Sequence, residues 1–155
     1  MNGVLSVEVG YAGGSVENPS YKAVCTGSTG HAEVIQVTFN PELVTFEDIL
    51  NVFFTVHDPT TLNRQGSDVG TQYRSIILNH SVGQRETADR VIKSLEAENS
   101  WGAPIVTEVV PYDVFYLAEE YHQEYFDKNP NQGYCQVVIT PKVAKFRTSY
   151  SKTLK

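Results

Sequence analysis

Glu33 is the residue whose position best fits a catalytic role. The segment Ala32 to Phe39 alternates in hydropathy, which predicts a strand that carries Glu33, Ile35, Val37 and Phe39 on one face. That face is otherwise apolar, so the carboxyl group is expected to point toward the core, where burial raises its pKa. A carboxyl group that keeps its proton near neutral pH can serve as a general acid. The same pattern is also compatible with a strand-end glutamate that bends out to solvent.

The tyrosines form a second set of candidate functional groups. There are nine in 155 residues, and the following lie beside predicted loops: Tyr11, Tyr21, Tyr73, Tyr125 and Tyr134. A phenol close to a buried carboxyl group can donate a hydrogen bond to an oxygen that gains negative charge. Tyrosine rings also commonly complete a core edge with the hydroxyl in water. Asp68, in a glycine-flanked polar loop, suits a hydrogen-bonding site and a plain turn equally well.

The two cysteines, Cys25 and Cys135, are not in a CxxC motif, and the four histidines are scattered without metal-ligand spacing. We therefore expect no metal, no other cofactor and no structural disulfide. Cys25 follows Ala23 and Val24, and this context favours a buried structural thiol. The glycine pair Gly13–Gly14 lacks the spacing of a phosphate-binding loop.

The elements that must position these residues alternate irregularly and are joined by long loops. Strands are predicted at residues 4–9, 32–39, 73–78 and 105–110, with a last short one at 136–140. Helices are predicted from about Thr45 to Val56, from the Ser81 and Gln84 cap through Leu95, and from Leu117 to Phe126. With no repeat and no linker, residues 1–155 are expected to form a single α+β domain, a two-layer sandwich on a mainly antiparallel mixed sheet.

Charge and hydropathy narrow the possible partners. A formal charge of −6 and a pI near 5.1 argue against nucleic acid, and the basic residues near the end are expected to form a solvated terminus. The sequence has no apolar stretch long enough to span a membrane and no secretory signal at its start. We therefore expect no membrane contact, a cytoplasmic location and a monomer.

Six sequence blocks together carry a resemblance to a known family. They occur in this order: GYAGG (Gly10 to Gly14), NPSY (Asn18 to Tyr21), GSTGHAE (Gly27 to Glu33), HDPTTLNRQGSDVGTQYRS (His57 to Ser75), AEEYHQEY (Ala118 to Tyr125) and NPNQGYC (Asn129 to Cys135). This set closely resembles the A-type peptide methionine sulfoxide reductases and covers nearly the whole chain. The resemblance implies a ferredoxin-like core within the α+β sandwich.

The resemblance also implies an activity and a role for each site residue. Such enzymes reduce methionine-(S)-sulfoxide, free or in oxidised proteins, and thioredoxin then reduces the enzyme. By the resemblance, Glu33 is the proton donor, and Tyr21 and Tyr73 hydrogen-bond the sulfoxide oxygen. Asp68 and Tyr125 belong to the same substrate pocket, and Cys135 is the cysteine that resolves the oxidised nucleophile as a disulfide.

One motif of that family is absent. Nothing in residues 1–155 matches GCFW, which holds the nucleophilic cysteine and the aromatic walls that receive the substrate methyl group. We expect the chain to begin downstream of that motif, to lack its first strand and to be inactive as it stands. Three readings follow: an enzyme whose sequence is incomplete, an inactive module that still binds the sulfoxide, and a fragment that does not fold because strand edges are left unpaired.

Overall fold

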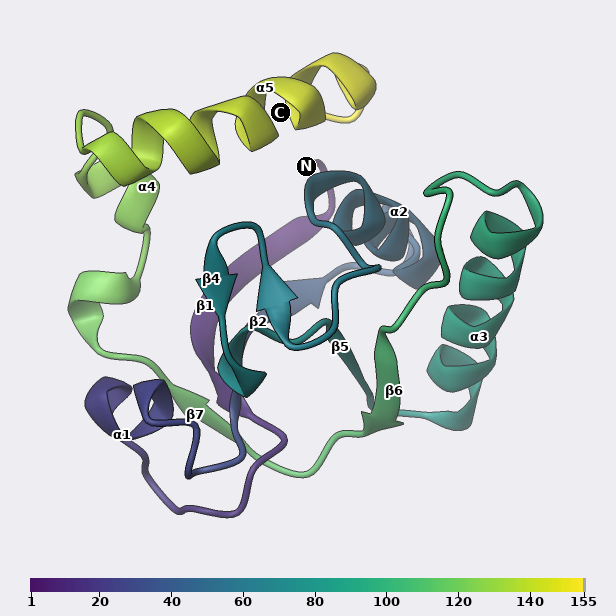
Figure 1. Ribbon diagram of the computed structural model, residues 1–155. Helices are drawn as coiled ribbons and strands as arrows, with labels where there is room; N and C mark the ends of the chain where they lie inside the picture. The colour runs from purple at the N-terminus through teal and green to yellow at the C-terminus, as the bar shows by residue number, and fades with distance from the viewer. Residues whose placement is uncertain (155) are drawn as a thin grey trace.

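The computed structural model describes residues 1–154, which combine strands and helices in an α+β arrangement (Figure 1). The helices are α1 (Tyr21–Cys25), α2 (Phe46–Val56), α3 (Val82–Ala97), α4 (Tyr125–Lys128) and α5 (Thr140–Ser149). The strands are β1 (Val4–Ala12), β2 (Ala32–Phe39), β3 (Arg64–Gln65), β4 (Asp68–Val69), β5 (Ile76–Asn79), β6 (Glu108–Pro111) and β7 (Phe115–Leu117). Two 3-10 turns, η1 (Thr71–Tyr73) and η2 (Glu120–His122), and a π-helical turn, η3 (Cys135–Ile139), complete the set.

The largest sheet has the strand order β2-β1-β7, and both of its strand pairs are antiparallel. The predicted mainly antiparallel α+β fold is therefore confirmed, with β5 and β6 forming a separate parallel pair. The central strand β1 places Tyr11 directly opposite Glu33 of β2. It also extends three residues beyond the predicted end, because Gly10 pairs with Leu117 of β7. A Cβ atom at Gly10 would lie 2.3 Å from the ring of Phe115, so only glycine fits this crossing.

The two long helices begin where their capping residues predict. Thr45 and Asp48 form a reciprocal capping box before α2, and the Ser81 side chain accepts the Gln84 N–H before α3. The apolar faces of both helices pack against β5 and β6 (Figure 1). We call this group the helical cluster; its buried members are Leu50, Phe54, Ile77, Ala88 and Val91. A second, smaller group, the tyrosine cluster, consists of Tyr11, Val24 and Ala118, with Val9 and Tyr21 packed against it.

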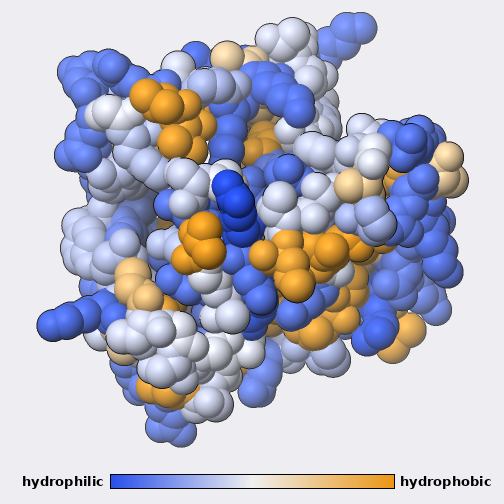
Figure 2. Space-filling model, viewed as in Figure 1, coloured by the Kyte–Doolittle hydropathy of each residue, from blue (hydrophilic) through white to orange (hydrophobic). Residues whose placement is uncertain are grey.

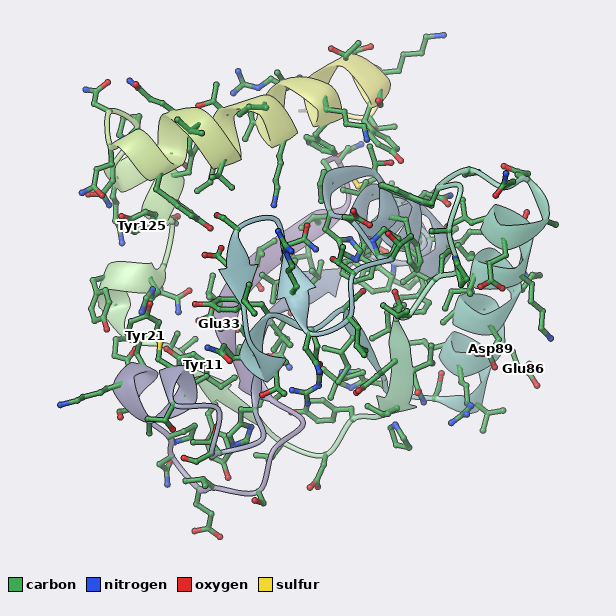
Figure 3. The ribbon with its side chains drawn as sticks, in the orientation of Figure 1. Tyr11, Tyr21, Glu33, Glu86, Asp89 and Tyr125 are labelled. Carbon is green, nitrogen blue, oxygen red and sulfur yellow. The ribbon has the colours of Figure 1, made fainter. Side chains whose placement is uncertain are left out.

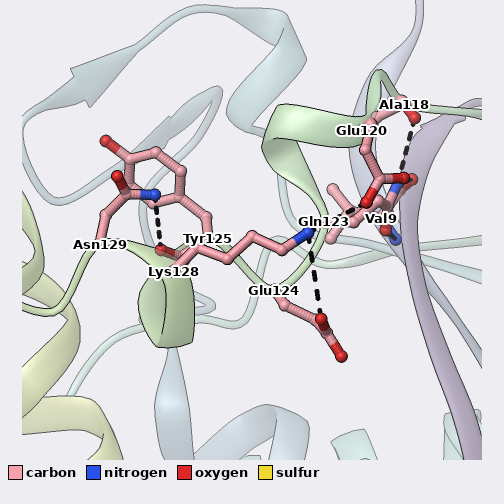
Figure 4. A network of polar contacts seen from close by, with 8 residues as sticks. All are labelled: Val9, Ala118, Glu120, Gln123, Glu124, Tyr125, Lys128 and Asn129. Atoms are coloured by element: carbon pink, nitrogen blue, oxygen red, sulfur yellow. Dashed lines mark hydrogen bonds and ion pairs between the residues drawn. The ribbon is translucent and has the colours of Figure 1, made fainter.

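The predicted helix from Leu117 to Phe126 is wrong. Leu117 ends strand β7, and the chain then makes the turn η2 before Glu124 adopts a left-handed conformation at φ 53°. The Gln123 side chain explains the break, since its amide bonds the N–H and C=O of Val9 and the C=O of Ala118 (Figure 4). Tertiary hydrogen bonds to β1 therefore override the local helical pattern.

The predicted strand at residues 136–140 is also wrong. Its β-branched residues lie instead in η3 and at the start of α5, which carries Pro141 in its first turn. A strand needs a neighbour for its backbone groups, whereas a helix satisfies them internally. Here α5 lies along one side of the molecule and contacts α2 (Figure 1). The hydroxyl groups of Thr55 and Tyr150 form a hydrogen bond of 3.1 Å at this contact.

The face of β2 that carries Glu33 is less covered than its pattern predicts. Ile35 is 57% exposed, and Val7 of β1 is 52% exposed. The prediction that Ile35 lies in the core is therefore wrong. Within residues 1–154, the outer edge of β2 has no partner strand and the β5–β6 pair is not bonded to the main sheet. Apolar side chains consequently reach the surface, in separate patches on the face shown in Figure 2. None of the helices in residues 1–154 has the length and apolar character needed to cross a bilayer.

His57 closes the end of α2 as a partly buried, hydrogen-bonded histidine. Its Nδ1 bonds the carbonyl oxygen of Phe53 and its Nε2 lies 2.8 Å from the Ser75 hydroxyl, which in turn lies 2.7 Å from that of Thr107. Burial lowers the pKa of His57 below its ordinary value. The folded protein therefore holds this imidazole in its neutral form at pH values where the unfolded chain has begun to protonate it.

This difference predicts a loss of stability in mild acid. Unfolded His57 binds a proton below about pH 6.5, while folded His57 does not, so the free energy of unfolding falls as the pH drops through this window. Urea denaturation of the wild type and of His57→Gln at pH 7.5 and pH 5.5 measures the effect. The wild type should lose more stability than the variant between the two pH values, and equal losses would contradict the assignment.

Candidate active site

Glu33 lies near the start of β2, partly buried and facing the same side as Tyr11 (Figure 3). Its Oε1 atom is buried and has no hydrogen-bond partner among residues 1–154. Burial raises the pKa of the Glu33 carboxyl, and the negative charge of Asp68 raises it further. A carboxyl group whose protonated form is favoured in this way, and whose buried oxygen is unoccupied, is suited to donate a proton to a polar ligand.

Tyr21, the first residue of α1, lies close enough to Glu33 for the carboxyl charge to affect its phenol. The Ser20 side chain caps the helix by accepting the Ala23 N–H at 3.2 Å. The Tyr21 ring packs against His122 at 4.4 Å between centroids and edge-on to Tyr121 at 6.4 Å. A hydrogen bond with the Cys25 thiol, burial, and the charges of Tyr73 and Glu33 all raise the pKa of the Tyr21 phenol. Tyr21 therefore remains a hydrogen-bond donor at every ordinary pH.

Tyr73 enters the same group from the turn η1. Burial raises the pKa of its phenol, and the charges of Glu33, Cys25 and Asp68 add to this effect. The turn is tied to both neighbours: the buried Gln72 side chain donates to the carbonyl oxygen of Cys25 at 3.3 Å, and Arg74 donates to that of Gly30 at 3.0 Å. These bonds fix η1 between α1 and the start of β2.

His31, two residues before Glu33, has a structural role. Its side chain is only 1% exposed, and Nδ1 accepts the Gly14 N–H at 3.0 Å while Nε2 donates to the carbonyl oxygen of Val16 at 2.7 Å. Both ring nitrogens are thus occupied. The loop after β1 is held against the start of β2, and Glu33 keeps its register opposite Tyr11.

Asp68 connects the group to the C-terminal part of the chain. Its carboxylate accepts the Tyr134 hydroxyl at 2.9 Å, across 66 positions of sequence. Burial and this hydrogen bond raise the pKa of the Tyr134 phenol to about 12. The structure thus brings together Glu33, Tyr21, Tyr73 and Asp68, all of which the sequence singled out.

Two other predicted site residues are not brought to this group. The Tyr125 hydroxyl donates to Gln132 at 2.6 Å, and Figure 3 shows Tyr125 on α4, apart from Tyr21 and Glu33. Cys135 is fully buried in η3 and is linked to the group only through its neighbour Tyr134. The expectation that Cys25 is buried is wrong: its thiol is exposed beside Tyr21.

The sequence did not single out Glu119, which binds two members of the group. Its Oε2 accepts the Tyr11 hydroxyl and its Oε1 accepts the Tyr21 N–H, each at 2.9 Å. Glu119 lies inside the AEEYHQEY block, but no local pattern distinguishes it from the adjacent Glu120. In the part of the chain that the structure describes, no three His, Cys, Asp or Glu side chains are grouped as metal ligands. The chemistry on offer is proton donation and hydrogen bonding to a neutral polar ligand.

The raised pKa of Glu33 predicts a measurable dependence on Asp68. Asp68→Asn removes the like charge but leaves the burial unchanged. The pKa of Glu33 should therefore fall in this variant and still remain above that of a free glutamate. Side-chain carbon NMR during a pH titration reports this value, and Glu33→Gln identifies the signal by removing it. An unchanged Glu33 pKa in Asp68→Asn would mean that the two carboxyl groups do not interact.

Comparison with known proteins agrees with this geometry. The sequence profile described as peptide methionine sulfoxide reductase matches residues 1–154. The chain is 52% identical over 155 residues to a peptide methionine sulfoxide reductase of Deinococcus radiodurans, covering 100% of this chain and 75% of that protein. A Sulfolobus acidocaldarius relative with the same description is 53% identical, covering 97% and 84%. The solved structure of reduced Mxr1 from Saccharomyces cerevisiae superposes with a TM-score of 0.80 at 41% identity, covering 86% of this chain and 76% of that one. The chain therefore belongs to the peptide methionine sulfoxide reductase family.

Proposed function

We propose that this site binds the S epimer of methionine sulfoxide, free or in oxidised proteins, and supplies the proton for its reduction to methionine. The observation that carries the proposal is the buried, unpartnered Oε1 of Glu33 beside the phenols of Tyr21 and Tyr73. A sulfoxide oxygen is a strong acceptor with no proton of its own. It complements a site in which the pKa values of the two phenols and of the Glu33 carboxyl are all raised, which favours their protonated forms.

Each group has a distinct part in the proposed reaction. The attacking thiolate is that of the family's GCFW motif, which residues 1–155 do not contain. It attacks the sulfoxide sulfur, and the sulfoxide oxygen takes the proton of Glu33. The oxygen stays on that cysteine as a sulfenic acid, and methionine leaves. Tyr21 and Tyr73 donate hydrogen bonds to the oxygen while its negative charge grows. The negative charge of Asp68 favours the protonated form of Glu33 that this step requires. Tyr125 is left out of this proposal because it lies on α4, apart from Tyr21 and Glu33 (Figure 3).

The catalytic cycle is completed by thiol exchange. In this proposal the Cys135 thiol attacks the sulfenic sulfur, which releases water and forms a disulfide, and the dithiol of thioredoxin then reduces that disulfide. Mxr1 of Saccharomyces cerevisiae has been solved in complex with Trx2, which supports thioredoxin as the reductant. Because Cys135 is buried in η3, the π-helical turn must open before its sulfur can react. A reducing compartment suits this cycle, so we propose that the protein acts in the cytoplasm. We also propose that it acts as a monomer.

Binding of a single sulfoxide epimer tests the proposal directly. The dissociation constant of N-acetyl-methionine sulfoxide, measured by NMR titration with the separated S and R epimers, should be smaller for S. Tyr21→Phe and Tyr73→Phe should each weaken S binding by about fivefold, the cost of one hydrogen bond. The double variant should weaken it by roughly thirtyfold, because no phenol donor then remains.

A matched control is Tyr112→Phe, since Tyr112 stacks on His80 outside this group. It should leave the dissociation constant unchanged. If the double variant binds no more weakly than the two single variants, Tyr21 and Tyr73 do not share the sulfoxide oxygen. Equal affinity for both epimers would overturn the assignment of the S epimer.

The same protein samples can be assayed for reduction of the sulfoxide by residues 1–155. Neither cysteine of the chain lies in a GCFW motif, and the aromatic walls of that motif, which orient the substrate methyl group, are absent from residues 1–155. Although the Cys25 thiol lies beside Tyr21, we therefore expect binding without reduction. Incubation with dithiothreitol and the S epimer should release no methionine above background. Release that disappears in Cys25→Ser or in Cys135→Ser would show that the corresponding thiol acts as the nucleophile.

A further inference from the structure

We propose that Glu119 is a positioning residue, which holds Tyr21 and the Glu33 face of the sheet in the arrangement that binds the sulfoxide. The inference rests on the proposed function, because it assigns to Glu119 the alignment of the groups that contact the sulfoxide oxygen.

One carboxylate bridges two segments of the site. Its Oε1 accepts the backbone N–H of Tyr21 across 98 positions of sequence, and its Oε2 accepts the Tyr11 hydroxyl across 108 positions, both at 2.9 Å. The His122 ring, on which Tyr21 packs, lies 3.7 Å from Oε2. Glu119 therefore fixes the backbone of Tyr21 and lies beside the His122 ring on which the Tyr21 ring packs.

The first segment, α1, needs such a tether. It has only five residues, and a helix this short is not stable by itself. The Tyr21 N–H is one of the groups at the helix start that has no partner inside the helix. Glu119 supplies this partner from the other end of the sequence, so the position of the Tyr21 phenol depends on it.

The second segment is the strand face itself. Tyr11 is buried directly opposite Glu33, and its hydroxyl has Glu119 as its acceptor. Burial of Tyr11 and the Glu119 bond raise the pKa of this phenol, which therefore stays a donor. The hydrogen bond from Tyr11 thus holds the Glu119 carboxylate at the face of the sheet that carries Glu33.

Glu119 is itself held from both sides. The N–H of Ala118 donates to the carbonyl oxygen of Val9 at 2.9 Å, and the Gln123 amide bonds both backbone groups of Val9 (Figure 4). Although burial alone would raise the pKa of Glu119, hydrogen bonds from the Tyr21 N–H and the Tyr11 hydroxyl hold it below its ordinary value. The tether is therefore a carboxylate, which makes stronger hydrogen bonds than a neutral acceptor does.

The test combines Glu119→Ala, Glu119→Gln and Tyr11→Phe with Glu120→Gln as the matched control. Glu120 is the adjacent glutamate, its side chain is 88% exposed, and it contacts Lys128 (Figure 4). Three quantities are measured: the NMR signals and hydrogen exchange of the Tyr21 amide, the dissociation constant of N-acetyl-methionine-(S)-sulfoxide, and the melting temperature. Glu119→Ala should speed exchange of the Tyr21 amide by about tenfold and weaken S-sulfoxide binding by about tenfold, as for loss of a hydrogen bond to a charged group.

Rescue separates positioning from general stability. Glu119→Gln keeps an oxygen for the Tyr21 N–H, so it should restore most of the amide protection and of the affinity. Tyr11→Phe removes one of the two donors to Glu119, so it should have a smaller effect than Glu119→Ala on both measurements. The double variant should behave like Glu119→Ala alone, because the two changes remove the same hydrogen bond. Glu120→Gln should match the wild type in all three measurements.

The outcomes distinguish the two proposals. If Glu119→Ala lowers the melting temperature but leaves the Tyr21 amide or the S-sulfoxide affinity unchanged, Glu119 has only a structural role and the inference is overturned. If the wild-type chain binds no sulfoxide, the proposed function fails instead. In that case the hydrogen exchange of the Tyr21 amide decides whether Glu119 positions α1. An unchanged exchange rate in Glu119→Ala would overturn the positioning role.

Discussion

The half-buried carboxyl group of Glu33, with one oxygen unpaired, sets the constraint around which the site is arranged. Removing an ionised carboxyl from water without a partner is costly, so burial favours the protonated form of Glu33, and the charge of Asp68 strengthens that preference. Its location depends on register. Because side chains alternate along a strand, a slip of one residue between β1 and β2 would turn Glu33 to the opposite face and separate it from Tyr11. The pairing of β1 on both edges prevents such a slip.

Local sequence signals predicted the elements whose structure is decided locally. The strand Ala32–Phe39 and the caps at Thr45 and Ser81 were correct, because alternation and capping depend on neighbours within a few residues. Two secondary-structure predictions, a helix at residues 117–126 and a strand at residues 136–140, were wrong because local pattern did not decide the structure of these segments. The first is broken by the bonds from Gln123 to Val9, and the second forms the π-helical turn η3, which continues into α5.

The site residues likewise differ in whether the sequence alone could identify them. Strand periodicity pointed to Glu33, and family motifs pointed to Tyr21, Tyr73 and Asp68, which the structure brings together from three segments. The motifs could not say which acidic residue of the pair Glu119–Glu120 faces inward. One carboxylate bonds Tyr11 and Tyr21, while the other lies in solvent beside Lys128. This difference arises from the turn after β7, which is fixed by contacts across more than one hundred positions of sequence.

The two apolar clusters have a consequence for how the molecule assembles. All buried members of the helical cluster come from one continuous stretch, from Leu50 to Val91, so short chain closures suffice to form it. The tyrosine cluster must join Tyr11 and Val24 to Ala118, a far longer closure. We therefore infer that the helical cluster forms before the tyrosine cluster when the chain folds. The Glu33 face of the sheet is therefore completed late in folding, when the segment around Ala118 packs against Tyr11 and Val24.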